Sequence, residues 1–222
     1  MDSLLVDWPR MWLVEGSRRL LCYDFENGKQ EEVYRSEQRL DGLLFRYGDG
    51  IYFEEWQEEQ NANCLRLDPT SGEISTFLSD SNIYHRYDLA FAGDRLYYTC
   101  GFGPAYSVSM EEDEEPRLED QDHWFTLAAF GGNLYYSKYT GDPMVTLNIA
   151  DQTPLTLEDG CDAIQLWGAN ENTLFLRVGR RRDYRLLAYD GEHDSTVLEE
   201  VSALRYQLGV LLSGSGRGVL VQ

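Results

Sequence analysis

The chain has 222 residues, of which 42% are hydrophobic and 13% aromatic, enough apolar material for a core and too much for an extended disordered chain. It carries 19 basic and 39 acidic residues, a net charge of −20, and this charge excludes nucleic acid and anionic membrane surfaces as expected partners. Its longest apolar runs are far shorter than a membrane span, so membrane insertion is not expected.

A small apolar and aromatic triplet that follows a turn recurs along the chain. Two clear copies are Leu96-Tyr-Tyr98 and Leu134-Tyr-Tyr136. The triplets begin at Met11, Ile51, Leu96, Leu134, Leu174 and Val210, at intervals of roughly 40 residues. In a strand-rich sequence this period indicates a β-propeller in which each repeat is one blade.

Taken in chain order, each repeat predicts short strands that we name a to d. The first repeat predicts strands at 3–8, 11–14, 19–23 and 30–34, and the second at 42–47, 51–53, 64–67 and 74–78. The third predicts 87–91, 96–99, 106–110 and 116–118, and the fourth 124–129, 134–137, 144–149 and 154–157. The fifth predicts 163–167, 174–178, 184–189 and 195–198, and a last copy predicts only 204–208, 210–212 and 218–221. No segment has the periodicity of a helix.

The turn between strands a and b carries Gly, Asn or Asp in nearly every copy, which are the residues that tolerate the positive φ of a two-residue hairpin. We therefore expect one all-β domain over residues 1–222. The predicted fold is a β-propeller of six blades, mostly of four antiparallel strands, and a five-bladed ring is the alternative.

The repeat resembles that of six-bladed YWTD-type and TolB-like propellers. Its fourth copy, with Leu134-Tyr-Tyr-Ser137, an apolar run to Ile149 and then Pro154-Leu-Thr-Leu157, carries the resemblance. It is most similar to uncharacterised bacterial propeller domains, and such families imply binding or scaffolding rather than catalysis. The aspartate that the YWTD pattern has two residues after the aromatic pair is replaced here by Glu55, Cys100 and Lys138, so its contacts between blades are not expected in this chain.

The connections that lead from strand d into the next strand a are acidic in every copy, and in a propeller they lie on one face around the channel. The candidate ligand- or partner-binding residues on this face are Asp80, Tyr84, His85, Asp120, Asp122, His123, Trp124, Asp159 and Asp162. His85 and His123 precede their triplets by the same number of positions (85 to 96, 123 to 134). Histidines beside carboxylates can bind a metal or act as acid and base. The alternative is that these aspartates form turns by bonding local amides. No metal site, cofactor or catalytic residue is predicted.

The favoured function is a non-catalytic module that binds a protein or peptide, basic ones included, through this acidic face. The alternative is a carbohydrate-binding or glycan-active protein that uses the same face, and a non-enzymatic role is favoured over an enzymatic one. No export signal follows Met1, so we expect a cytoplasmic protein, or an extracytoplasmic one if a signal has been removed. The four cysteines lack metal-ligand spacing, and Cys22 and Cys64 are expected to act as small buried hydrophobes.

Overall fold

The structure is a computed structural model that describes residues 4–57, 61–79, 81, 83, 89–100, 103–111, 114–139, 144–150, 152–157, 164–170, 172–180 and 183–198. Every regular element in these ranges is a β-strand. Within them, no helix is long and apolar enough to cross a membrane. The chain divides into two compact units, which are Met1–Asp88 with Thr99–Gly103, and Leu89–Tyr98 with Pro104–Gln222. The single domain that the sequence suggests stays a prediction.

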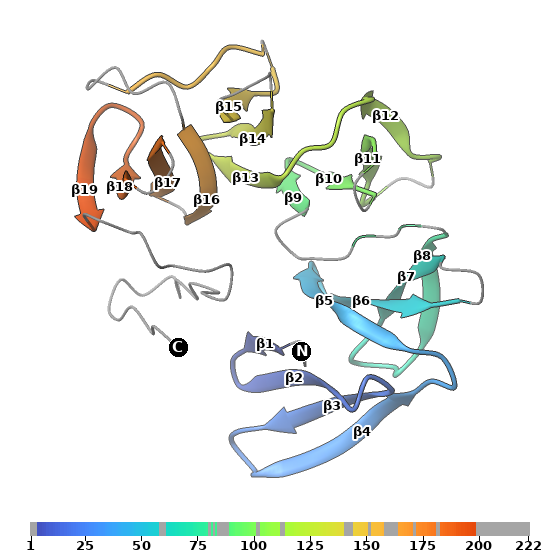
Figure 1. Cartoon of the computed structure of the whole chain (residues 1–222). Helices are drawn as coiled ribbons and strands as arrows, with labels where there is room; N and C mark the ends of the chain where they lie inside the picture. Colours follow the sequence, from blue (N-terminus) through green and yellow to red (C-terminus); the bar gives the residue numbers. More distant parts are fainter. Residues whose placement is uncertain are drawn as a thin grey trace. The chain divides into compact units, whose positions relative to one another are not determined.

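The first unit contains two four-stranded sheets whose strands follow one another in chain order (Figure 1). One sheet consists of β1 (Leu4–Asp7), β2 (Arg10–Glu15), β3 (Arg19–Asp24) and β4 (Lys29–Arg35). The other consists of β5 (Leu40–Tyr47), β6 (Gly50–Trp56), β7 (Ala62–Leu67) and β8 (Ile74–Leu78). All neighbouring strands are antiparallel, so each sheet is the meander expected for a blade.

The second unit contains three more meanders (Figure 1). They comprise β9 (Leu89–Ala92), β10 (Arg95–Thr99), β11 (Ala105–Ser109) and β12 (Arg117–Asp120), then β13 (Thr126–Phe130), β14 (Asn133–Tyr139) and β15 (Met144–Asn148), and last β16 (Ile164–Asn170), β17 (Thr173–Arg180), β18 (Asp183–Tyr189) and β19 (Asp194–Leu198). The first strand β13 lies against both β9 and β16, so successive sheets of this unit pack through their first strands.

The strand predicted at 154–157 is wrong. The structure has a single antiparallel bridge there, between Leu147 and Pro154, and the sheet of β13, β14 and β15 keeps three strands. Proline has no amide hydrogen to donate to a strand ladder, which explains why regular pairing does not form around Pro154. The next residue still bonds to the sheet, because the Leu155 amide donates to the Thr146 carbonyl at 2.8 Å.

The turns between the first and second strands have the predicted backbone conformation. Gly93, between β9 and β10, has a φ of 65°, and Gly131 and Gly132, between β13 and β14, have φ values of 57° and 78°. Glycine adopts this left-handed region without steric cost, and it matches the twist of the two strands of a hairpin. Local turn chemistry therefore fixes these hairpins.

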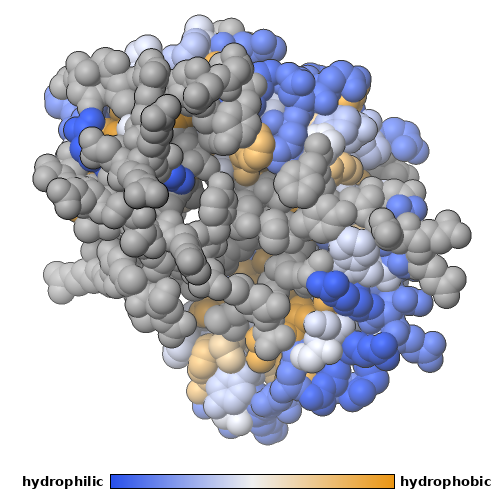
Figure 2. Space-filling view, in the orientation of Figure 1, coloured by the Kyte–Doolittle hydropathy of each residue, from blue (hydrophilic) through white to orange (hydrophobic). Residues whose placement is uncertain are grey.

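The first and third residues of the aromatic triplets lie in the core. Leu96 and Leu134 are 0% and 1% exposed, and Tyr98 and Tyr136 are 3% and 1% exposed. Hydrophilic residues gather on the side of the first unit where the outer strands β4 and β8 lie (Figure 2). The three described cysteines, Cys22, Cys64 and Cys100, form no disulfide, and the first two are buried as expected. The last predicted copy, 204–221, lies outside the described residues.

Candidate functional site

The acidic connection that precedes β13 is the predicted site that the structure describes most fully. Asp120 is the last residue of β12, and one of its carboxylate oxygens accepts a hydrogen bond from the Asp122 amide at 3.0 Å. A short side chain that bonds an amide two residues later makes an Asx turn, which sends the chain from β12 toward β13. Asp120 is thus the turn-forming aspartate that the sequence offered as the alternative to a binding residue.

The other oxygen of Asp120 joins this turn to strand β14. It accepts from the Lys138 ammonium at 2.9 Å and from the Trp124 indole nitrogen at 3.0 Å. The same ammonium lies 3.4 Å from the Asp122 carboxylate. We call the residues Asp120, Asp122, Trp124 and Lys138 the Lys138 cluster.

The electrostatics of the Lys138 cluster favour an intact ion pair. Burial alone would raise the pKa of Asp120, but the hydrogen bonds from the Asp122 amide, Trp124 and Lys138 outweigh it, so this pKa is lowered. Burial would likewise lower the pKa of Lys138, and the hydrogen bond and charge of Asp120 outweigh it, so this pKa is raised. The two shifts are opposite in sign and both favour the charged form, so both groups are charged near neutral pH.

Trp124 and His123 have different surroundings in this connection. Trp124 is 1% exposed and stacks on Tyr136, with ring centroids 4.1 Å apart and planes 25° apart. A buried indole needs a partner for its N–H group, and Asp120 supplies it. The His123 ring meets Phe125 edge to face at a centroid distance of 4.5 Å. Trp124 therefore belongs to the core, where it anchors the connection.

The structure brings together some of the predicted site residues. Asp120, Asp122 and Trp124 meet around Lys138, and His123 lies between the last two in sequence. Asp122 is the open member of the cluster, since its side chain is 69% exposed while that of Asp120 is 20% exposed. The other predicted site residues, Asp80, Tyr84, His85, Asp159 and Asp162, lie outside the described residues.

Lys138 was missed as a site residue, and its position explains why. It stands two residues after Tyr136, where the YWTD pattern has aspartate, so the sequence presented it only as a departure. The equivalent positions in other repeats also contact the connection that precedes their own sheet. The Glu55 carboxylate accepts from the Ser36 hydroxyl and, at 2.6 Å, from the Tyr34 hydroxyl, and Cys100 donates to the Ser81 carbonyl at 2.9 Å. This position therefore contacts the preceding connection in three repeats, each time through a different side-chain chemistry.

The residue that directly precedes Glu55, Cys100 or Lys138 is buried. Glu54, Thr99 and Ser137 all have 0% exposure. Glu54 accepts from the Ser81 hydroxyl at 2.7 Å and from the Ile83 amide at 2.6 Å.

In the second unit the matching contact joins β14 to β16. Ser137 accepts from the Leu166 amide at 2.8 Å and bonds to the Thr146 hydroxyl at 3.0 Å. Because the Thr146 hydroxyl donates to the Ile164 carbonyl at 2.9 Å, its proton is already used and Ser137 must be the donor in their bond. Adjacent residues of one strand, which lie on opposite faces of the sheet, thus contact the preceding connection and the following segment.

The rest of the described residues contain neither a metal site nor a large pocket. No group of three or more His, Cys, Asp or Glu side chains there has the arrangement of a metal site. A pocket of about 190 Å³ lies at the turn between β18 and β19, where it is lined by Thr173, Ala188, Asp190, His193, Asp194 and Ser195. Ligand pockets usually enclose about 300 to 1,000 Å³, so this hollow is small for an organic ligand.

The sequence matches no protein-family model and no curated protein. Three solved structures are similar in fold. TolB from Acinetobacter baumannii has a TM-score of 0.55 at 11% identity, over 89% of this chain and 52% of TolB. Pyrococcus horikoshii acylaminoacyl peptidase has a TM-score of 0.61 at 10% identity, over 88% and 38% of the two chains. An uncharacterized protein of Listeria monocytogenes EGD-e has a TM-score of 0.57 at 13% identity, over 90% and 70%.

The chain has a propeller-like fold. Similarity to TolB supports the resemblance found in the repeat, and at these identities it concerns the fold alone. The chain spans about half of TolB, and less of the peptidase. The number of blades and the specific propeller family stay predictions.

Proposed function

We propose that this chain is a non-catalytic propeller module that binds a protein or peptide segment carrying positive charge, through the acidic connections that precede its first strands. The observation that carries the proposal is the Lys138 cluster. It fixes the connection from within, through Asp120 and Trp124, while the Asp122 carboxylate of the same connection is 69% exposed.

A fixed exposed charge is suited to recognition. A connection already ordered by its own sheet loses little conformational entropy when a partner binds. Exposed carboxylates at the rim of an interface mainly accelerate association and select against partners of the wrong charge. The net charge of −20 acts in the same direction over a longer range.

The alternative, a glycan-active enzyme on this face, needs a carboxylic acid that stays protonated to donate to the leaving group. Asp120 is poorly suited to that role, because its pKa is lowered and its oxygens already accept three hydrogen bonds. The proposal of a binding module therefore has better support.

The test uses a library of random short peptides selected on the immobilised protein, followed by fluorescence anisotropy of the recovered peptides. We expect enrichment of arginine and lysine, and binding that weakens strongly between about 50 mM and about 500 mM NaCl. Asp122→Asn should weaken binding about threefold, the effect of one rim charge. The matched control is Glu192→Gln, an exposed acid in the turn between β18 and β19 of the same unit, which should bind like the wild type.

Two results would contradict the proposal. One is a set of recovered peptides without basic enrichment, or equal losses in the Asp122 and Glu192 variants. The other is hydrolysis of a member of a glycan and ester panel by the wild-type protein that is abolished when the acidic connection is altered.

A further inference from the structure

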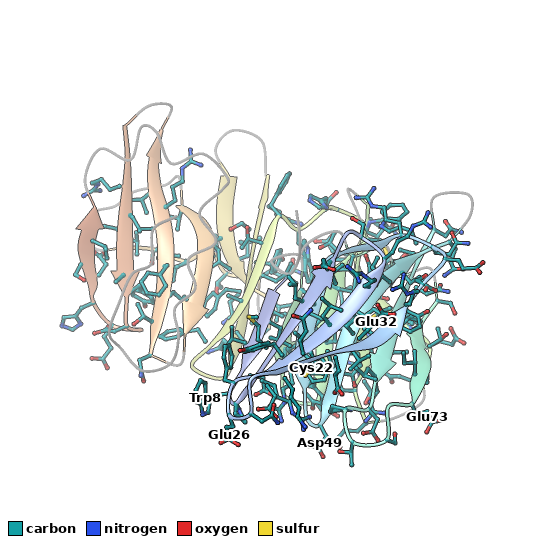
Figure 3. All side chains as sticks on the ribbon, turned by 90° about the horizontal axis from the view of Figure 1, so that it is seen from below. Trp8, Cys22, Glu26, Glu32, Asp49 and Glu73 are labelled. Carbon is teal, nitrogen blue, oxygen red and sulfur yellow. The ribbon has the colours of Figure 1, made fainter. Side chains whose placement is uncertain are left out.

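The first sheet exposes two large aromatic side chains at the turns that join β1 to β2 and β3 to β4. Trp8 is 73% exposed and Phe25 is 39% exposed. Both turns lie at the end of this sheet opposite Ser36 and the connection to β5, where Figure 3 labels Trp8 and Glu26. An isolated exposed tryptophan needs no explanation, but a supported pair of aromatic rings at one end of a sheet is a typical interaction surface.

The two rings are held in place. Trp8 stacks on Phe25 with ring centroids 5.4 Å apart and planes 11° apart, and Tyr23 supports Phe25 edge to face at 5.1 Å. The backbone fixes the same arrangement, since the Phe25 amide donates to the Pro9 carbonyl at 2.9 Å and ties one turn to the other. The indole is thus pre-organised while most of its surface remains in water.

The polar groups of the second turn are occupied by the turn itself. One Asp24 oxygen accepts from the amides of Glu26 at 2.9 Å and Asn27 at 3.2 Å, and the other accepts from the Asn27 side chain at 2.9 Å. The Asn27 oxygen accepts in turn from the Lys29 amide at 2.9 Å. A sugar stacked on the indole would need several fixed donors and acceptors for its hydroxyls, and these groups are already used.

The strand residues at this end of the sheet have neighbours of opposite charge, whereas Glu26 forms no ion pair within the described residues. Asp7, Arg10, Asp24 and Lys29 pair across the four strands in register, so their side chains alternate in sign along one row. Arg46 of β5 adds an ion pair to Asp7. Glu26 is exposed, follows Phe25 in the turn, and lies at the same end of the sheet as Trp8 (Figure 3). An aromatic face beside a carboxylate is the arrangement that favours a cation over a neutral ligand.

We propose that Trp8 and Glu26 bind a cationic side chain, arginine or lysine, of a partner polypeptide. The cation lies against the exposed indole face, and the Glu26 carboxylate accepts its hydrogen bonds. Tryptophan has the most favourable ring for such a contact, and a guanidinium also stacks on it through its planar group. This surface and the acidic connections are independent, so either can be present without the other.

The experiment is a titration of the whole chain, labelled with ¹⁵N at the indole nitrogens, with a blocked tri-arginine peptide. The Trp8 indole resonance is identified by its absence in Trp8→Leu. We expect this resonance to shift on titration, and the shift to be lost with a tri-citrulline peptide, which has the same shape without the charge. Glu26→Gln should weaken binding about threefold, whereas Glu73→Gln, an exposed acid at the turn between β7 and β8, should not change it. Asp122→Asn should also leave the Trp8 shift unchanged.

The thermal unfolding midpoint of each variant checks that it is folded, and Glu26→Gln keeps the test decisive if Trp8→Leu is unstable. The proposal is overturned if the arginine peptide leaves the Trp8 resonance in place or if the citrulline peptide shifts it equally. Equal weakening by Glu26→Gln and Glu73→Gln, or a Trp8 shift with maltotriose in place of the peptide, would overturn it too.

Discussion

Replacing Lys138 with methionine removes the charge at the centre of the Lys138 cluster and keeps most of the aliphatic chain. The Lys138 and Asp120 side chains are 16% and 20% exposed, and their charged atoms lie 2.9 Å apart. With an effective dielectric constant of about 20, charges at this distance attract by about 6 kcal/mol. The cost of removing both charges from water offsets most of this attraction. The net contribution of a hydrogen bond between charged groups to the free energy of unfolding is about 2 kcal/mol. We expect Lys138→Met to lower the free energy of unfolding by that amount, and the melting midpoint by about 4 to 8 °C.

A double-mutant cycle assigns this loss to the correct carboxylate. Urea unfolding followed by tryptophan fluorescence is measured for Lys138→Met, Asp120→Asn and the double variant, and the same cycle is repeated with Asp122→Asn. The coupling energy should be about 1.5 kcal/mol for Asp120, and below about 0.5 kcal/mol for Asp122, because that side chain is 69% exposed. Equal coupling to both carboxylates would refute the reasoning.

The pH dependence of stability gives the same pair a second signature. The pKa of Asp120 is lowered by folding, so its contribution is present above about pH 4 and is lost as the pH falls through the folded value. The pKa of Lys138 is raised, so its contribution is present below about pH 10 and is lost as the pH rises through the folded value. Lys138→Met should therefore lower the free energy of unfolding most between about pH 4 and about pH 10, and should reduce its dependence on pH below and above this range.

Three further predictions concern the rest of the described chain. Burial and the Glu55 carboxylate raise the pKa of Tyr34 to about 12, so an ultraviolet pH titration should contain a component near pH 12 that Tyr34→Phe removes, and the stability due to this group should be lost as the pH rises from about 10 to 12. Ser137→Ala should cost about 2 kcal/mol, and amide exchange at Leu166 should accelerate because its buried N–H loses its acceptor, while the exposed Ser75→Ala should change neither quantity. Because Gly131 has a φ of 57°, Gly131→Ala should lower the free energy of unfolding by about 1 kcal/mol, as measured by thermal unfolding. Gly131→Asn should lower it clearly less, because asparagine tolerates this region.

The sequence predicted the strands best where the pattern depends on neighbouring residues. The glycine turn at Gly93 and the aromatic triplet at Leu134 each specify a hairpin locally, and the structure has both. The strand expected at 154–157 failed because its apolar residues suit a strand but Pro154 cannot complete a ladder. Alternating apolar residues reveal which face a strand buries, and the hydrogen-bonding capacity of each residue decides whether it pairs.

The candidate site was harder to predict because its contacts are distant in sequence. Asp120 and Asp122 were found from their place before a first strand, yet nothing local distinguishes the aspartate that forms a turn from the one that faces solvent. The distinction comes from Lys138, on the next sheet's second strand. Trp8 went unnoticed because a tryptophan in a β-rich repeat usually enters the core, as Trp124 does, and only the fold reveals that its ring stays outside.

One position makes an equivalent contact in several repeats although its residue type differs. In the repeats that have an aromatic pair, the second position after it contacts the connection that precedes its sheet, as a carboxylate at Glu55, a thiol at Cys100 and an ammonium at Lys138. Because the connection before β13 is the one held by an ammonium, its acidic residues are stabilised by their own sheet. That leaves Asp122 free to face solvent at little cost in stability, which is the condition a rim charge must meet to serve a partner.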